Sequence, residues 1–300
     1  MSAPAWYTGP PKGPGIEPGY EKHPLVFYLG THQPHWLWDD AASFPLFVSH
    51  RTLCKYKTLR RSTHGWALDS GGFSEVSRFA EWRTSPREYA AAVASYDTEI
   101  GGLHWAAPQD WMCEPAAIHG GGPGRFAGTH LSVAEHQART VANFCELCEL
   151  WPAYSGEQCP FMPVLQGWVP GDYWRCADLY DRVGVWLEDY PVVGLGSVCR
   201  RQGTPAVTRL IGELTPWIAV HAFGMKKAGL AAAGHRLTSA DSMAWSFDAR
   251  RHQIRLPGHT HGNCANCLPH ATQWRQRLLA DVEAAGMRGH QDDLFSGWAG

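Results

Sequence analysis

The sequence lacks any long apolar segment. No apolar run approaches the ~18 residues that a transmembrane helix requires. Residues 1–21 also lack the basic start, the apolar centre and the small-residue cleavage site of a secretory signal. We therefore predict a soluble, cytoplasmic protein that does not act at a membrane.

The chain also lacks a strong excess of charge of one sign. Its 26 Lys and Arg residues and 28 Asp and Glu residues leave a formal net charge of -2, and its pI is near 6.8. This balance excludes a generally basic protein that coats nucleic acid through charge alone. Local basic patches are still compatible with it, although each pair of cations is also compatible with an ordinary solvated surface. The candidate pairs are Arg60-Arg61, Arg200-Arg201, Lys226-Lys227, and Arg250-Arg251 with Arg255.

A disulfide framework is the third absence. Nine cysteines, an odd number, are scattered over 300 residues, which fits a reducing compartment. We interpret most of them, including Cys145 and Cys148 in an amphipathic segment, as small buried hydrophobic residues.

Cys264 and Cys267 differ from the other cysteines, because they form a Cys-x2-Cys motif in a loop rich in Gly, His and Asn. With His261 they supply zinc-type ligands at short loop spacing. We predict a structural zinc that these three residues hold, and no organic cofactor. A turn that merely contains two thiols is the alternative. The candidates for a fourth ligand are His259, His270 and His290.

Short apolar segments that run into polar or glycine residues recur along the chain and alternate with helix-like segments. This alternation predicts βαβ units and a parallel sheet, and repeated right-handed crossovers favour closure into a TIM-type (β/α)8 barrel. The length of 300 residues suits one such barrel. The strand candidates are residues 25–30, 66–68, 100–107, 161–165, 191–197, 218–220 and 236–240, with an eighth near 252–256; the helix candidates are residues 86–97, 132–151, 171–188 and 204–214.

We expect three segments in the chain. Residues 1–24, rich in Pro and Gly, are predicted to form an irregular leader, and residues 25–257 the barrel. Residues 258–300 are predicted to form the Cys/His loop and a helix packed on the barrel. No internal sequence repeat is visible.

The segment Asp69-Ser70-Gly71-Gly72-Phe73 carries the clearest chemical signal. An apolar run delivers a carboxylate into a turn with paired glycines, which is how a barrel enzyme presents an acid at the C-terminal end of a strand. The glycines let a flat ligand approach the main chain, and Phe73 offers a ring on which it can stack. The alternative is a strand that ends in a tight turn, with Asp69 as a helix N-cap.

Six motifs follow one another at the ends of the strand candidates: Asp-Ser-Gly-Gly-Phe from 69, Pro-Gln-Asp from 108, Pro-Val-Leu-Gln-Gly from 163, Gly-Leu-Gly-Ser from 194, His-Ala-Phe-Gly from 221 and Ala-Asp-Ser from 240. With the Cys-x2-Cys tail, this order resembles the queuine/archaeosine tRNA-guanine transglycosylase superfamily. The sequence is most similar to the branch that inserts 7-deazaguanines into DNA, the deoxypurine-in-DNA transglycosylases. The resemblance extends over roughly residues 25–274.

The resemblance implies two catalytic carboxylates. Asp241 matches the family's nucleophile and Asp69 its acid/base residue, while Phe73 matches the aromatic residue that stacks on the base. Two carboxylates that flank an anomeric carbon exchange the group on a sugar through a covalent intermediate in retaining glycosidases. The implied activity is replacement of guanine in DNA by a 7-deazaguanine, such as 7-cyano-7-deazaguanine, through a glycosyl-aspartate intermediate.

The resemblance also implies a pocket that recognises the base. Asp110 matches the carboxylate that accepts hydrogen bonds from guanine, and Gln166 matches an amide that reads another edge. Gly196 matches a backbone donor to the base carbonyl, and His221 falls near the residue on the opposite face of the base. The partners that follow are DNA, the 7-deazaguanine base, and further proteins of a DNA-modification cluster.

The sequence departs from the tRNA branch in two places. The tRNA enzymes carry Cys-x-Cys-x2-Cys, whereas Gly262 stands at the first cysteine position here, and the residues after Asp241 read Ser-Met-Ala-Trp-Ser. Both departures favour DNA as the acceptor. The alternatives are a tRNA-guanine transglycosylase, a non-catalytic nucleic-acid-binding homologue, and a metal-dependent barrel hydrolase. The hydrolase needs His-x-His after the first strand, and His32 and His35 are separated by two residues instead.

Overall fold

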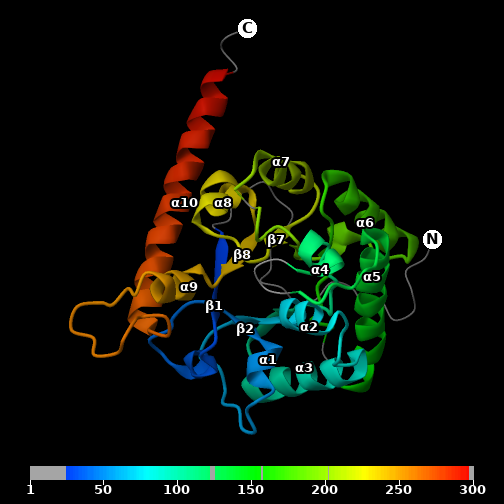
Figure 1. Ribbon diagram of the computed structural model, residues 1–300, viewed down its shortest axis with the longest axis horizontal. Helices are drawn as coiled ribbons and strands as arrows, with labels where there is room; N and C mark the ends of the chain where they lie inside the picture. Colours follow the sequence, from blue (N-terminus) through cyan, green and yellow to red (C-terminus); the bar gives the residue numbers. More distant parts are fainter. Residues whose placement is uncertain (1–24, 122–125, 157, 202, 297–300) are drawn as a thin grey trace.

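A curled sheet of parallel strands forms the centre of the protein in a computed structural model (Figure 1). The structure describes residues 25–121, 126–156, 158–201 and 203–296, with side chains as far as residue 286, so the predicted leader of residues 1–24 lies outside the described residues. The eight strands follow the order β4-β3-β2-β1-β8-β7-β6-β5. They are β1 (Val26–Thr31), β2 (Leu46–Ser49), β3 (Trp66–Asp69), β4 (Leu103–Ala106), β5 (Val164–Leu165), β6 (Val193–Leu195), β7 (Val220–Ala222) and β8 (Ser239–Ser242).

Helices lie between successive strands and surround the sheet (Figure 1). Two of the longest, α3 and α5, begin with capping boxes in which Ser85 pairs with Glu88 and Ser132 with Glu135. These boxes satisfy backbone N–H groups that the first turn leaves without a helical partner. The helices are η1 (Pro34–Trp38), α1 (His50–Leu53), α2 (Gly72–Phe79), α3 (Pro86–Ile100), α4 (Pro115–His119), α5 (Val133–Leu150), η2 (Trp151–Ala153), α6 (Pro170–Arg182), η3 (Leu187–Asp189), α7 (Pro205–Leu214), α8 (Lys227–Ala233), η4 (Gly234–Arg236), α9 (Ala244–Arg251) and α10 (Leu268–Ser296).

The prediction of an eighth strand near residues 252–256 is wrong. These residues follow α9 without forming a strand, and β8 pairs directly with β1, where Tyr28 is in register with Asp241. No edge is left between β8 and β1 for a further strand. The strand that the sequence reading missed is β2, which lies between β1 and β3.

The two outer strands of the sheet, β4 and β5, lie near each other. The Ala106 N–H donates to the Pro160 carbonyl at 2.8 Å, and the Met162 N–H donates to the Ala106 carbonyl at 3.1 Å. These bonds form a parallel bridge between Ala106 and Phe161, which comes just before β5. The sheet is therefore strongly curled rather than open and flat.

Side chains alternate between the two faces of each strand. Those on the inner face of the curled sheet form a compact aromatic cluster with Tyr28, Phe47 and Trp105 at its centre. Those on the outer face, such as Phe27 and Leu68, pack against the surrounding helices in the main hydrophobic core. These side chains fill the inside of the curled sheet, so a site is expected at the ends of the strands.

The C-terminal helix α10 lies along one side of the protein and extends beyond it (Figure 1). The helix contacts β1, α8, α9 and η4, and Ala271, Leu278 and Val282 join the main core. Within the described part of the chain, no helix is both long and apolar enough to cross a membrane.

Candidate active site and metal centre

The C-terminal ends of the strands bring most of the predicted site residues to one edge of the sheet. Asp69 ends β3, Asp241 lies in β8, and Gln166 and Gly196 directly follow β5 and β6. Asp69 and Gln166 lie two residues after Ala67 and Val164, whose side chains face the inside of the curled sheet. His221 of β7 contacts the aromatic cluster there, and Asp241 contacts His221. Period-two alternation therefore directs these residues toward the inside of the curled sheet.

The turn after β3 holds Asp69 in place with two donors. Its carboxyl group accepts hydrogen bonds from the Ser49 hydroxyl and the Gly71 N–H, and Ser49 is in register with Asp69 in the β2–β3 ladder. Gly71 is left-handed, with φ of 85°, and a Cβ on Gly72 would lie 2.9 Å from Trp82. Each glycine is thus required by the local geometry of the turn.

Asp110 lies after β4, beside the start of α2. The Trp82 indole donates to its carbonyl at 3.3 Å, and its side chain accepts a short hydrogen bond from Gln166 Nε2. Burial raises the pKa of Asp110 to about 7, the nearby Asp69 carboxyl adds to the rise, and the Gln166 bond opposes it. Near neutral pH this group therefore changes between a hydrogen-bond donor and a pure acceptor.

Gln166 is fully buried and Gly196 makes room for it. A Cβ on Gly196 would lie 2.2 Å from Gln166 Nε2, so no other residue type fits beside the amide. The Gly196 N–H itself donates to the Leu165 carbonyl at 3.0 Å within the sheet. The role of Gly196 as a backbone donor to the base stays a prediction, while its lack of a side chain is what leaves room for the Gln166 amide.

Asp241 and His221 form a contact on the inner face of the sheet. Asp241 Oδ1 accepts the Gly224 N–H at 2.8 Å and lies 3.4 Å from His221 Nε2. His221 Nδ1 lies 2.9 Å from the Ser239 hydroxyl, and its ring contacts Trp105 at a centroid distance of 4.6 Å. The imidazole is completely buried. It therefore contacts Asp241 from the interior of the sheet and does not line the solvent-exposed surface.

Asp69 and Asp110 both have a raised pKa, and a neighbouring carboxylate contributes to each rise. Burial raises the pKa of Asp69, and the charge of Asp241 raises it further. Asp69 in turn raises the pKa of Asp110. Burial and like charge together favour the protonated form of Asp69 and of Asp110, so either could hold a proton for acid/base chemistry.

Phe73 opens α2 at the rim of the site, about half exposed at 48%. Its ring meets Phe126 edge to face at 5.4 Å, and the Arg200 guanidinium lies 5.5 Å from the Phe73 ring centre and 4.9 Å from that of Phe126. Arg200 Nε is held 3.2 Å from the buried Glu114 carboxylate. The structure thus combines the predicted stacking residue with one member of a predicted basic pair.

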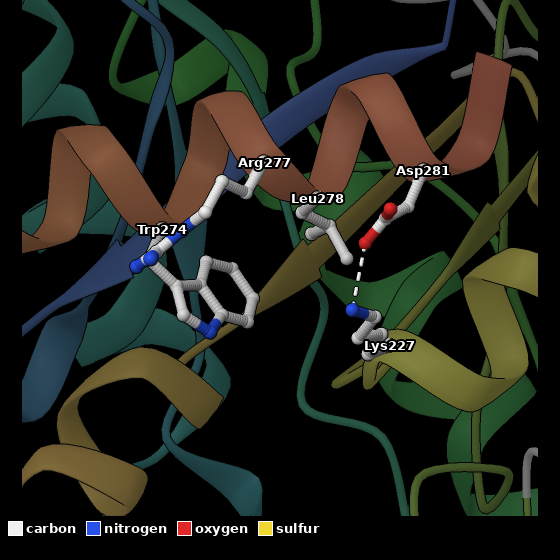
Figure 2. A pocket seen from close by; sticks show the side chains of 5 residues that line it. All are labelled: Lys227, Trp274, Arg277, Leu278 and Asp281. Atoms are coloured by element: carbon white, nitrogen blue, oxygen red, sulfur yellow. Dashed lines mark ion pairs between the residues drawn. The ribbon is translucent and has the colours of Figure 1, made fainter. Parts of the chain in front are cut away.

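The second basic pair that follows a strand end, Lys226-Lys227, lies beside α10. Lys227 Nζ is 2.7 Å from Asp281 Oδ2, next to a pocket that Trp274, Arg277 and Leu278 also line (Figure 2). The Lys227 ammonium is therefore directed toward the C-terminal helix.

Four potential metal ligands converge in the loop before α10. One ligand atom from each of His259, His261, Cys264 and Cys267 lies within 4.8 Å of all the others. Cys264 Sγ accepts the Leu256 N–H at 3.3 Å and lies 3.1 Å from His261 Nε2. Two thiols and two imidazoles form the donor set of a closed tetrahedral metal site, so this cluster could bind a metal ion.

The structure narrows the choice of the fourth ligand. His259 belongs to the cluster, with its Nδ1 3.4 Å from Cys267 Sγ. His270 is buried outside the cluster, and neither of its ring nitrogens has a hydrogen-bond partner among the described residues. The side chain of His290 lies outside the described residues.

Comparison with known families gives the family of the chain. The model of the family deoxypurine in DNA protein A matches residues 22–300. The chain belongs to this family. Membership confirms the resemblance to the DNA branch of the transglycosylase superfamily and indicates a 7-deazaguanine DNA transglycosylase kind of function, with DNA as the substrate. No curated protein matches the chain.

Sequence reasoning missed several residues that support the site of this deoxypurine in DNA protein A family member. Ser49 lies in β2, a strand that was not predicted, and Glu114 lies in a loop that contains no recognisable motif. Ser197 is visible in the Gly-Leu-Gly-Ser motif, but nothing in that motif indicates its hydrogen bond to Gln166. Such contacts join residues far apart in the chain, and only the fold brings them together.

Proposed function

We propose that this protein exchanges guanine in DNA for a 7-deazaguanine through a covalent bond between Asp241 and the deoxyribose. The observation that carries the proposal is the pairing of Asp69 and Asp241 at one edge of the sheet, where the charge of one raises the pKa of the other. Two carboxyl groups, one as nucleophile and one as acid/base, are what a double displacement at an anomeric carbon requires.

In the first half of the proposed reaction, Asp241 Oδ2 attacks C1′ of the target nucleotide. Among the described residues, Gly224 and His221 both contact Oδ1 of this carboxylate, so we assign Oδ2 to the sugar. The C1′–N9 bond breaks, and the leaving guanine takes a proton from Asp69. A carboxyl group with a raised pKa holds that proton at a higher pH than an exposed aspartate does.

In the second half, the incoming 7-deazaguanine occupies the place of guanine. Asp69, now ionised, removes the proton from N9, and N9 attacks C1′ while the bond to Asp241 breaks. Both carboxyl groups return to their starting states, so no water is consumed and no abasic site is formed. The reaction needs no organic cofactor.

Recognition of the base is assigned to Asp110, Gln166 and Phe73. Asp110 accepts the N–H donors of a guanine-type edge in its ionised form, and the exposed ring of Phe73 stacks on the base. The target base must leave the helical stack to reach this edge of the sheet, at a cost of a few kcal/mol. Stacking and edge recognition offset that cost. We also infer that the Ala106–Phe161 bridge closes the sheet into a TIM-type barrel with this site at its C-terminal face.

We propose that the cluster of His259, His261, Cys264 and Cys267 holds a structural zinc. The supporting observation is the two-thiol, two-imidazole donor set, together with the backbone N–H bond to Cys264 Sγ. A closed four-ligand zinc supplies folding free energy and takes no part in the chemistry. The ion would join the loop before α10 to the rest of the chain.

Purified protein is expected to contain about one zinc per chain, because one such four-ligand site binds one ion. Cys264→Ser should lose the metal and lower the unfolding temperature, and removal of the ion by a chelator should do the same. Elemental analysis and calorimetry measure both quantities. The exposed Cys54 offers the control Cys54→Ser, which should keep the metal. A metal-free wild type, or a Cys264→Ser protein of unchanged metal content, would rule out the zinc.

We further propose that Arg200 holds a phosphate of DNA beside Phe73, and that Lys226-Lys227 adds a second contact. Because phosphate contacts release counterions, Arg200→Ala should reduce the slope of log affinity against log salt by about one. Fluorescence anisotropy with a labelled oligonucleotide at several salt concentrations measures that slope. Arg182, at the opposite end of the sheet on α6, provides the control Arg182→Ala. An unchanged slope in Arg200→Ala would remove Arg200 from the DNA contact, and the double variant Lys226→Ala/Lys227→Ala tests the second pair.

The proposed function is tested by base exchange in vitro. Oligonucleotides of DNA and of RNA that carry radiolabelled guanine are incubated with the protein and 7-cyano-7-deazaguanine. Without the second base, release of label from DNA should not exceed the amount of protein, because each chain stops at the covalent adduct; with the second base, release should continue through repeated turnovers. Release from RNA alone would reassign the protein to a tRNA-type activity, and no release from either would support a non-catalytic role.

A further inference from the structure

Ser197, directly after β6, has an unusual backbone conformation for a residue that is not glycine. Its φ is 56°, in the left-handed region, and its exposed fraction is 7%. A left-handed serine is strained where glycine would be relaxed, and such strain is often maintained at sites where a side chain has a task.

The hydroxyl group of Ser197 lies in a continuous chain of hydrogen bonds. It accepts the Cys113 N–H at 2.8 Å and donates to Gln166 Oε1 at 2.7 Å. The N–H of Cys113 can only donate, and the single proton of the hydroxyl needs an acceptor. The geometry therefore fixes the carbonyl end of the Gln166 amide on Ser197.

This arrangement determines the direction of the next bond. With Oε1 held by Ser197, Nε2 of Gln166 is turned toward Asp110 and donates to its Oδ2. Gly196 adds to the restriction, because its missing Cβ is what leaves space for Nε2. A reversed amide would place its oxygen against the Asp110 carboxyl group and leave the Ser197 proton without an acceptor.

We propose that Ser197 is a positioning residue that sets the hydrogen-bond direction from Cys113 through Gln166 to Asp110, so that Asp110 meets the base as an acceptor. The ligand class that fits an acceptor at this position is a purine-type base with N–H donors on its edge, as in guanine and its 7-deaza analogues. The inference rests on the proposed function, because it places the base at Asp110.

The chain of hydrogen bonds from Cys113 through Ser197 and Gln166, here called the relay, should affect the pH at which Asp110 loses its proton. The titratable groups that face Asp110 are Asp69, Tyr89, Cys113 and Tyr180. Burial raises the pKa of both tyrosines and of the cysteine, so these three groups stay protonated near neutral pH, where Asp110 titrates with a pKa of about 7. Burial also raises the pKa of Asp69. The bond from Gln166 lowers the pKa of Asp110, so loss of the relay should keep Asp110 protonated to higher pH.

The experiment measures binding of radiolabelled guanine to the full-length protein by equilibrium dialysis between pH 6 and 9. Ser197→Ala should weaken binding about tenfold at pH 7, the usual effect of one lost buried hydrogen bond. Binding should recover toward pH 9, where Asp110 ionises without help. Ser197→Gly, which removes the hydroxyl but relieves the left-handed strain, should show the same loss, which separates the hydroxyl from the backbone.

A double-mutant cycle with Gln166 tests whether Ser197 acts through that amide. In the Gln166→Ala background, Ser197→Ala should cause no further loss, whereas independent effects would add. Guanine affinity of Ser197→Ala and Ser197→Gly equal to wild type at pH 7, or full additivity in the cycle, would overturn the inference and leave the proposed function intact. A wild type that binds no guanine at any pH would overturn both.

Discussion

Asp241→Asn is expected to abolish base exchange, with a loss of at least about a thousandfold, as is typical when a nucleophile that forms a covalent intermediate is removed. The amide keeps the shape of the carboxylate and can still accept the Gly224 N–H that now bonds Oδ1. What it loses is the nucleophilic oxygen. The change should therefore leave the unfolding temperature close to wild type while removing the protein–DNA adduct from denaturing gels.

The adduct is the decisive readout for Asp241. Wild-type protein mixed with a guanine-containing oligonucleotide, without a second base, should yield a band of slower mobility after denaturation. Asp178→Asn on the outer helix α6, where the side chain is exposed, is the matched control and should keep that band. An Asp241→Asn protein that still forms the adduct, or still exchanges labelled guanine, would assign the nucleophile to another residue.

Asp69→Asn is expected to slow exchange by about 10²- to 10⁴-fold, the usual contribution of a general acid/base. The asparagine cannot give a proton to the leaving guanine or remove one from the incoming base. Adduct should accumulate slowly and then persist, because the second half of the reaction also requires Asp69. Time courses on denaturing gels separate this pattern from the complete loss expected for Asp241→Asn.

The pH profile gives an independent check on Asp69. Burial raises the pKa of its carboxyl group, so the protonated form needed to expel guanine decreases as the pH rises through that value. Wild-type adduct formation should therefore decline at the alkaline end of the profile, and this decline should disappear in Asp69→Asn. A variant with a wild-type profile and an undiminished rate would show that another group supplies the proton.

Most of the sheet could be predicted from the sequence because its strands share one pattern, an apolar run that ends in glycine or a polar residue. β2 follows the same pattern, since its apolar run ends in Ser49, but it comes directly after Pro45 and continues into α1 without a loop, and it was missed. Residues 252–256, which resemble a strand in composition, have no partner strand, because β8 is already paired with β1. Strand pairing depends on contacts between segments that are distant in the chain, so it cannot be predicted from the local sequence.

The site shows the same division between local and long-range information. Asp69, Asp110, Gln166 and Asp241 could be named because each stands in a motif at the end of a strand candidate, and the order of these motifs resembles the transglycosylase superfamily. The contacts that orient them could not, since Ser197 is 31 residues from Gln166 and Cys113 is 84 from Ser197. The use of the Gly196 N–H within the sheet was likewise invisible before the fold was known.

The sequence predicted a cluster of zinc-type ligands but did not identify all four of its members. The spacing of His261, Cys264 and Cys267 indicates zinc-type ligands directly. His259 and His270 were equivalent candidates by sequence distance, and only the path of the loop separates them, since it brings His259 to the thiols.

The central claim is that this protein places a 7-deazaguanine in DNA, and mass spectrometry of nucleosides tests it most directly. DNA and tRNA are isolated from cells that express the protein together with a source of 7-cyano-7-deazaguanine, and are digested to nucleosides. The account predicts a 7-deazaguanine deoxynucleoside in the DNA of cells with wild-type protein, none in their tRNA, and none in either from cells with Asp241→Asn. A modified ribonucleoside in tRNA with unmodified DNA would contradict it.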